Sequence, residues 1–541
     1  MKIVQLPFMT LKYLLLLAFL VNQQLSAAEI YKVIQPEWRY SVRPGDNLIR
    51  FARQHLINPD DWHALQKLNQ IKNPYRMPIG QVLRVPLHLV KQLPVSAEVA
   101  LTSGQAGILK ANNSLEPVTI GQQLTAGTAL KTGENSKLNI KFADGSIVSM
   151  QPNSLLKLDA LSIYSGGGMV DTTLRLQQGK LETEANPAHS QGNKMQIITP
   201  TAVAAVRGTK FRVSTDDISV KQETLEGKVA LQAAGTEVAV DKGFGSVSEG
   251  GAPPLPPIML LVAPALANFP IKLDALPVTF SMPAQDGAVA WLAKLSNEAQ
   301  FNSILAEKLI NGSQLSFDDL PDGQYFLQVR AKDKQGLEGY DATHEFNLNA
   351  RPFAPKIVAP AQAAIIREPN PELSWERVEQ ANQYLLELAR DADFKQLLDS
   401  QHVANTVYKI EKNLEPGQYF WRLASVDGLD QGPYMAPSSF TYRAKPNAPD
   451  ISQLLVHIHQ NRVFVSTVSP PSGLVYQAVI HNEFNNQKNV WRGTVNASEF
   501  SYLLKEYGKQ TLVLHLVDAD GTSGSDAVYE FNAPPPKNLN N

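Results

Sequence analysis

The chain has 541 residues, too many for one hydrophobic core and enough for roughly three to five domains. Hydrophobic residues make up 43% of the chain, which is typical of a globular protein. The formal net charge is −2, so electrostatics do not favour binding to nucleic acid or to an anionic membrane surface. Cysteine is absent, which excludes disulfides, thiolate metal ligands, cysteine nucleophiles and a lipid-modified cysteine.

The first predicted element is a signal peptide over residues 1–28. Basic residues precede an apolar segment at 13–21 that is too short to span a bilayer comfortably. Ser26-Ala27-Ala28 then supplies the small residues that a signal peptidase reads. An uncleaved anchor is the alternative, although polar residues 22–24 interrupt the apolar segment. We therefore expect an exported protein that begins at Glu29 and has no stable membrane insertion after cleavage.

Residues 38–88 carry a strand–helix–helix–strand pattern. Residues 40–42 alternate as a short strand, and Asp46 is expected to cap the helix that follows. Asn58-Pro59 breaks this helix, a second helix follows, and residues 81–86 alternate again as a strand. A unit of about fifty residues is small but viable without disulfides.

This unit resembles a LysM domain, a carbohydrate-binding module of cell-wall proteins. The resemblance rests on Tyr40-x-Val42-x-Pro44-Gly45-Asp46-x-Leu48, on Leu68-Asn69-x-Ile71 and on Pro78-x-Gly80-Gln81-x-Leu83-x-Val85-Pro86. In that family, glycans containing N-acetylglucosamine lie in a shallow groove between two loops. The resemblance implies that ten residues form this groove: Gly45, Asp46, Asn47, Leu48, Asn73, Pro74, Tyr75, Arg76, Met77 and Pro78.

The chemistry of these residue types suits a glycan. Backbone amides and asparagine can bond acetamido groups, while Tyr75 and Met77 would offer an apolar floor for a sugar ring. Peptidoglycan or another N-acetylglucosamine-containing glycan is therefore the expected partner. The alternative is a LysM scaffold that binds another protein, because a fold alone does not fix a function.

Residues 86–117 are expected to be a connector with one strand-like stretch, and residues 115–250 to form a β-rich domain. Short alternating segments in this domain are separated by turns such as Asp144-Gly145 and Gln178-Gly179. Gly166-Gly167-Gly168 lacks the lysine and helix of a phosphate-binding loop, so we interpret it as a turn.

The most distinctive stretch of this domain is residues 199–213. An apolar run ends at Arg207-Gly208, and alternation then resumes with Thr209 and Phe211 on one side. Gly208 predicts a bend or a close backbone approach. Arg207 is expected to bond carbonyl groups at a sheet corner, and a ligand contact is the alternative.

The same stretch, Thr-Pro-Thr-Ala-x-x-Ala-Val-Arg-Gly-Thr-Lys-Phe, resembles the signature of the FecR-like domain, an extracytoplasmic β-rich module. The resemblance extends from about Val118 to Gly250 and implies a stacked, solenoid-like β-fold with an interaction or sensing role. FecR proteins proper regulate sigma factors across the inner membrane, which makes transcriptional signalling an alternative function.

A Pro-rich linker is predicted at residues 251–272, and its composition suggests that few contacts cross it. A repeat follows, in which Gly323-Gln324-Tyr325-Phe326-Leu327 matches Gly417-Gln418-Tyr419-Phe420-Trp421. A fainter third copy begins at Gly508, and the copies lie about ninety residues apart, the length of one β-sandwich. This pattern resembles fibronectin type III-like or immunoglobulin-like domains. Three sandwiches are predicted, at 273–350, 352–444 and 447–534.

The fold class is thus mainly β and multidomain, with a small α+β module, a solenoid-like β domain and three tandem sandwiches. His457 and His459 share a strand face but have no third ligand in view, and no catalytic motif, metal site or cofactor site is predicted. We expect a non-enzymatic periplasmic or envelope-associated protein that binds glycan and an unidentified envelope protein, and no nucleic acid. A LysM-targeted wall hydrolase is a further alternative.

Overall fold

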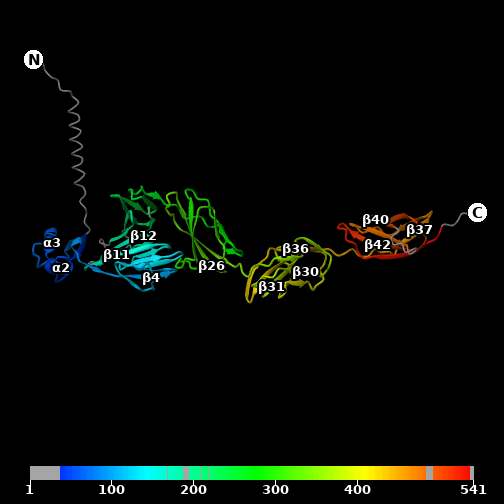
Figure 1. The fold of residues 1–541 in the computed structure, drawn as a ribbon, viewed down its shortest axis with the longest axis horizontal. Helices are drawn as coiled ribbons and strands as arrows, with labels where there is room; N and C mark the ends of the chain where they lie inside the picture. The colour runs from blue at the N-terminus through cyan, green and yellow to red at the C-terminus, as the bar shows by residue number, and fades with distance from the viewer. Residues whose placement is uncertain are drawn as a thin grey trace, which may run out of the picture. The chain divides into compact units, whose positions relative to one another are not determined.

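A computed structural model describes residues 37–166, 168–186, 194–206, 209–216, 218–482 and 491–535 (Figure 1). The chain divides into two compact units, one ending at Leu348 and one beginning at Asn349. Strands predominate in both, as predicted. The expected signal peptide lies outside the described residues. Within them, no helix combines the length and apolar character needed to cross a membrane.

The N-terminal module (residues 37–91) has the predicted strand–helix–helix–strand order. Its elements are β1 (Glu37–Ser41), α2 (Leu48–His55), η1 (Pro59–Asp61), α3 (Trp62–Leu68), β2 (Val82–Pro86) and η2 (Leu87–Leu89). β1 and β2 pair antiparallel, with Trp38 opposite Val85. The helices close over this ribbon because Leu48, Leu65 and Leu83 share one buried core.

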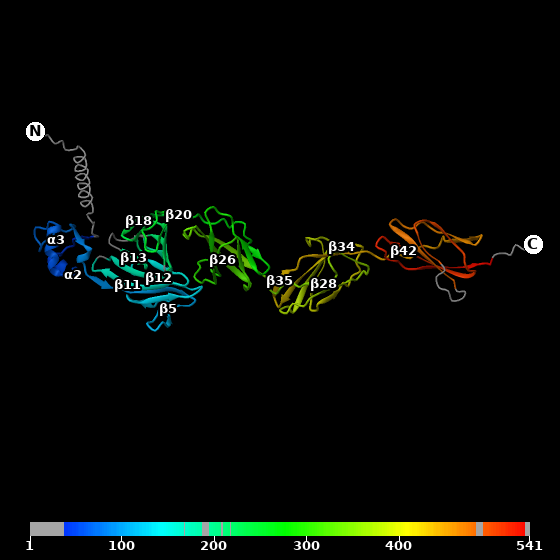
Figure 2. The ribbon, with the colours of Figure 1, turned by 45° about the horizontal axis from the view of Figure 1, so that its top comes forward.

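The central module contains two sheets. Its strands are β3 (Gln92–Pro94), β4 (Ala97–Ser103), β5 (Ala106–Leu109), β6 (Leu115–Pro117), β7 (Gln123–Leu124), β8 (Ala129–Thr132), β9 (Lys137–Lys141), β10 (Ile147–Met150), β11 (Leu155–Tyr164), β12 (Val170–Glu184), β13 (Lys194–Ile198), β14 (Val203–Val206), β15 (Lys210–Thr215), β16 (Ser219–Glu226), β17 (Lys228–Ala233), β18 (Thr236–Asp241), β19 (Phe244–Glu249) and β20 (Ile258–Met259) (Figure 2).

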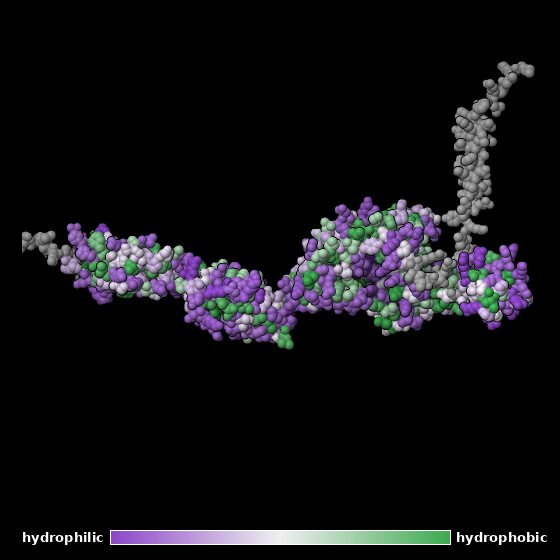
Figure 3. All heavy atoms as spheres, turned by 180° about the vertical axis from the view of Figure 1, so that it is seen from behind, coloured by the Kyte–Doolittle hydropathy of each residue, from purple (hydrophilic) through white to green (hydrophobic). Residues whose placement is uncertain are grey.

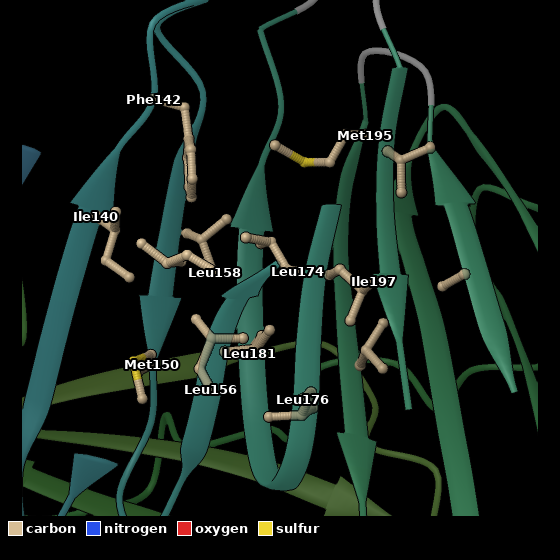
Figure 4. Packing of buried hydrophobic residues seen from close by; sticks show 14 of the residues in the cluster. Ile140, Phe142, Met150, Leu156, Leu158, Leu174, Leu176, Leu181, Met195 and Ile197 are labelled. Carbon is tan, nitrogen blue, oxygen red and sulfur yellow. The ribbon is translucent and has the colours of Figure 1, made fainter. Parts of the chain in front are cut away.

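The long strand β12 joins the two sheets. Its first half pairs with β11 and β13, and its second half pairs with β10 and β15. Gly179 lies where the strand changes sheets, at φ +93°, and a Cβ there would lie 2.4 Å from the Ser154 hydroxyl oxygen. Leucine, isoleucine, methionine and phenylalanine side chains fill the space between the sheets, as the close view of Leu156, Leu174 and Leu181 shows (Figure 4).

The expected connector at 86–117 is largely part of these sheets. β4 pairs with β9, β5 pairs with β8, and β3 pairs with β11. The sequence obscured this because β3 and β6 are only three residues long and contain proline, and because β3 pairs with β11, which lies far along the chain.

The first sandwich contains β21 (Lys272–Leu273), β22 (Val278–Ser281), β23 (Ala290–Ser296), β24 (Ala306–Ile310), β25 (Gln314–Phe317), β26 (Gly323–Lys332) and β27 (Ala342–Leu348). The expectation that few contacts cross the Pro-rich segment is wrong. β20, inside that segment, pairs with β19, and the Tyr340 amide donates to the Leu261 carbonyl at 3.0 Å. The central module and first sandwich therefore belong to one compact unit.

The second unit holds two further sandwiches. The first consists of β28 (Ile357–Ala359), β29 (Ala364–Ile366), β30 (Glu372–Trp375), β31 (Gln383–Ala389), β32 (Leu397–Val403), β33 (Val407–Lys409), β34 (Gly417–Asp427), β35 (Asp430–Tyr434) and β36 (Ser438–Tyr442). The other consists of β37 (Leu455–His459), β38 (Arg462–Ser466), β39 (Leu474–Asn482), β40 (Trp491–Val495), β41 (Glu499–Leu503), β42 (Gly508–Asp518) and β43 (Ala527–Ala533).

The repeat seen in the sequence corresponds to one strand of each sandwich. β26 lies between β23 and β27, β34 lies between β31 and β36, and β42 lies between β39 and β43. Each strand buries alternate apolar side chains, which explains why the same pattern recurs. Hydrophilic residues cover most of the face drawn in Figure 3, with hydrophobic residues scattered among them.

Candidate functional site

The two loops predicted to form a groove lie against each other in the N-terminal module. The Leu48 amide donates to the Pro74 carbonyl at 2.8 Å, which joins the loop before α2 to the loop after α3. The side chain of Leu48 is fully buried, so only its backbone is near the groove. Gly45 is exposed at φ +88°, a left-handed conformation that favours glycine in this turn.

The predicted N-cap of α2 is wrong by one residue. Asn47, not Asp46, is the N-cap of α2, and its Oδ1 accepts from the Arg50 amide at 2.8 Å. Asp46 Oδ2 instead accepts from the Tyr40 hydroxyl at 2.6 Å and from the Arg43 amide at 2.7 Å. Burial alone would raise the pKa of Asp46, but these hydrogen bonds and nearby arginines hold it below its usual value. Asp46 is therefore an ionised residue that fixes the first loop.

The second loop contains a turn at Asn73, whose Oδ1 accepts a hydrogen bond from the Tyr75 amide at 2.9 Å. Tyr75 is 72% exposed, so its ring is available to a ligand. Met77 is only 6% exposed and packs in the module core, so the expectation that it forms an apolar floor is wrong. Ile79, which the sequence analysis did not select, is 70% exposed two residues further on. The position of Ile79 directly after the predicted loop is the sequence signal that could have identified it.

Three of the remaining groove candidates, Asn73, Arg76 and Pro78, are exposed, and Pro74 is half-buried. The site thus combines exposed backbone and apolar side chains with few free charges. Such an arrangement suits a neutral, polar ligand with apolar faces, as a sugar has.

The N-terminal module also contacts the turn between β11 and β12. His55 Nδ1 lies 3.2 Å from the Ser165 hydroxyl oxygen, and the Ser165 amide donates to the Lys91 carbonyl at 2.8 Å. A Cβ on Gly166 would lie 2.4 Å from the His55 ring and 3.1 Å from Trp38. The glycine-containing turn predicted here therefore permits close approach between modules, and burial lowers the pKa of His55.

The predicted FecR-like signature is only partly described. Arg207 and Gly208 lie outside the described residues. Thr209 and Phe211 are both buried, and Phe211 packs in the core of the central module.

A buried ionic cluster connects the central module with the first sandwich. Arg330 of β26, 3% exposed, bonds Glu338 at 3.0 Å, pairs with Glu182 of β12 at 2.7 Å, and also bonds Asp341. Arg212 of β15 donates to the Gly339 carbonyl at 2.8 Å. The Arg330–Glu182 and Arg212–Gly339 bonds join residues more than 100 positions apart and hold the two domains together.

The protonation of this cluster follows from its pairing. Burial opposes ionisation of Glu182, but Arg330 and Lys294 overcome it and keep its pKa well below the usual value. Burial raises the pKa of Glu223, whose Oε1 accepts from the Glu338 amide at 3.0 Å. The cluster therefore presents mostly ionised groups, of which Arg212, Arg330 and Glu338 are almost completely buried.

His457 and His459 are exposed with stacked rings 6.4 Å apart, and no group of three metal-ligating side chains occurs in the described part of the chain. Trp375 is buried and packs in the core of the second sandwich.

Comparison with known proteins identifies two domains. Residues 40–86 match the LysM domain family, and residues 128–230 match the FecR protein family. Both resemblances predicted from the sequence are thereby confirmed. No curated protein matches the chain as a relative. The two matches support an envelope protein with a sensing or binding role.

Several solved structures are similar to parts of the chain. A protein of Parabacteroides distasonis described as an anti-sigma factor is 12% identical with a TM-score of 0.20, over 24% of this chain and 58% of that one. The FN1–FN3 domains of chicken CNTN1 are 14% identical with a TM-score of 0.23, over 49% of this chain and 96% of that one. Fibronectin(III)-like modules of Clostridium thermocellum CbhA are 11% identical with a TM-score of 0.22, over 33% of this chain and 93% of that one. The chain spans little more than half the length of the first of these.

Proposed function

We propose that the chain is an exported, non-enzymatic envelope protein that binds peptidoglycan, or another N-acetylglucosamine-containing glycan, through its LysM domain. The supporting observation is the pair of loops joined by the Leu48 amide and the Pro74 carbonyl, beside which Tyr75 and Ile79 expose apolar side chains. LysM domains bind such glycans, and the exposed residues have the chemistry that a sugar requires.

Recognition in this proposal rests on shape and hydrogen bonds. Tyr75 and Ile79 pack against the apolar faces of sugar rings, while Asn73 and exposed backbone groups bond acetamido and hydroxyl groups. The carboxylate of Asp46 is occupied by Tyr40 and Arg43, so it shapes the loop and does not contact the ligand. Binding therefore depends little on ionic strength.

Calorimetric titration of the full chain with an N-acetylglucosamine oligomer tests this site. Tyr75→Ala and Ile79→Ala should each weaken binding by about tenfold, the equivalent of ~1.4 kcal/mol of lost apolar contact. Ile57→Ala is the matched control, because Ile57 is 64% exposed on the same module but lies outside both loops. Equal losses for Ile57→Ala, or no binding by the unaltered chain, would contradict the proposal.

In the same proposal, the FecR domain and the sandwiches form an interaction or sensing scaffold for an unidentified envelope protein. The buried ionic cluster makes the FecR domain and first sandwich one platform rather than two tethered domains. Crosslinking in intact envelopes, followed by identification of proteins captured with the chain, tests for such a partner. An absence of reproducible captured proteins would count against the scaffold role.

Regulation of transcription is the second candidate function, and the FecR family match at residues 128–230 favours it. Deletion of the gene should then change transcript levels of a defined set of genes, and re-expression of the chain should restore them. An unchanged transcript profile with loss of wall association would favour the scaffold role.

A further inference from the structure

A cleft of about 430 Å³ lies between the FecR domain and the first sandwich. Strands β9, β10, β12 and β15 line one side, and β23, β26 and residues 299–304 line the other. This volume falls within the range of about 300–1,000 Å³ typical of small-molecule sites. Sites of this kind occur preferentially where two domains meet.

The lining of the cleft is rich in positive charge. Five basic and three acidic side chains line it, and Glu307 and Glu338, outside the lining, also pair with its basic groups. Two of the basic groups are already paired. Arg330 binds Glu182, Glu338 and Asp341, and Lys294 lies 3.6 Å from Glu307.

Of the other three basic groups, Lys137 and Lys210 form no ion pair with a described carboxylate, and Arg212 is only partly paired. Lys137 donates its Nζ hydrogen to the Phe301 carbonyl at 2.8 Å, which does not neutralise its charge. Lys210 is exposed and forms no ion pair with any described residue. Arg212 is 1% exposed, and its Nε has no hydrogen-bond partner within the described structure. Its other two nitrogens have partners, because Nη1 pairs with the Glu338 carboxylate at 3.5 Å and Nη2 donates to the Gly339 carbonyl at 2.8 Å.

Lys137 is on β9, whereas Lys210 and Arg212 are both on β15. All three share the lining of one cleft, so their donors can serve one ligand. A buried donor without a partner costs free energy, and an anionic acceptor removes that cost. Burial lowers the pKa of Lys137 by more than the charges of Glu182 and Glu298 raise it, as expected of an ammonium group removed from water.

We propose that this cleft binds a small hydrophilic dianion, held by Lys137, Lys210 and Arg212. The shared chemistry is a pair of negative charges on oxygen, which a dicarboxylate and a phosphate both supply. The ligand would bridge the FecR domain and first sandwich, because residues of both line the cleft. This inference is independent of glycan binding by the LysM domain.

Isothermal titration of the full chain in a low-salt buffer free of phosphate tests the proposal with three probes. Succinate represents dicarboxylates, inorganic phosphate represents phosphates, and succinamide is an uncharged analogue of succinate. Either anion should bind at one site, and succinamide should not. The anion that binds more tightly then identifies the source of the charge.

Two variants tie binding to the cleft. Lys137→Met and Lys210→Gln should each weaken anion binding by about tenfold, as expected for loss of a charge-assisted hydrogen bond. Lys210 is exposed, so Lys210→Gln should fold normally even if Lys137→Met does not. Lys141→Gln is the matched control, because Lys141 is an exposed lysine of the same strand as Lys137 but does not line the cleft. No anion binding, equal binding of succinamide, or full binding by Lys210→Gln would overturn the proposal.

Discussion

Replacement of Arg330 by methionine tests whether the FecR domain and first sandwich fold as one unit. Arg330 is almost completely buried and binds carboxylates on both sides of the interface, Glu182 from the FecR domain and Glu338 and Asp341 from the sandwich. Methionine keeps much of the side-chain volume but removes the charge. Removing one partner from a buried ionic network costs about 3–5 kcal/mol, because the remaining charges stay buried without compensation.

The matched control is Arg175→Met. Arg175 also pairs with a carboxylate, that of Asp159 at 2.6 Å, but its side chain is 43% exposed. Exposed pairs contribute about 0.2–1 kcal/mol because water screens them and the side chains lose entropy. The free energy of unfolding is measured by denaturant titration, and hydrogen exchange in β12 and β26 reports the FecR domain and sandwich separately.

In Arg330→Met, protection of β12 and β26 should fall together and by the larger amount. A loss below about 1 kcal/mol, equal to that of the control, would refute the argument that the cluster couples the two domains. Loss confined to β26 would show that the sandwich unfolds independently, as the Pro-rich composition of residues 251–272 had suggested.

Three other predictions concern the N-terminal module. Stability should fall as the pH drops below about 6.5, because burial lowers the pKa of His55 and the unfolded chain therefore binds a proton at His55 more readily. Thermal unfolding measured from about pH 8 to about pH 5 should show this loss of stability, and His55→Gln should make the loss smaller. Asn47→Ala should cost about 1 kcal/mol in denaturant titration, since it removes the α2 cap, and an unchanged midpoint would contradict that role. Gly166→Val should increase hydrogen exchange in α2, because a Cβ there overlaps His55; unchanged exchange would show that this contact is not maintained in solution.

Local signals predicted the N-terminal module well. Apolar spacing located both helices, and the motif residues placed the two loops that Leu48 and Pro74 bring together. The cap was assigned one residue early because Asp46 and Asn47 are both good caps by residue type. The choice between them depends on Tyr40, which binds Asp46 and which no local pattern connects to it.

The interface between the FecR domain and first sandwich could not be predicted from the sequence. Glu182 and Arg212 alternate with core residues, a pattern typical of a strand face in water. That face is covered by Arg330 and Glu338, whose positions depend on a fold that brings together residues more than 100 positions apart. A proline-rich composition indicated a spacer, although β20 within it joins a sheet.

The measurement that tests the central claim most directly is sedimentation of the full chain with purified, protein-free sacculi. The account predicts that the chain enters the pellet at both low and moderate salt, since recognition rests on hydrogen bonds and apolar contact rather than charge. Tyr75→Ala should shift the chain to the supernatant, whereas Ile57→Ala should not. If the unaltered chain stays in the supernatant at both salt concentrations, the LysM domain does not bind the wall, and a protein scaffold role replaces the glycan-binding proposal.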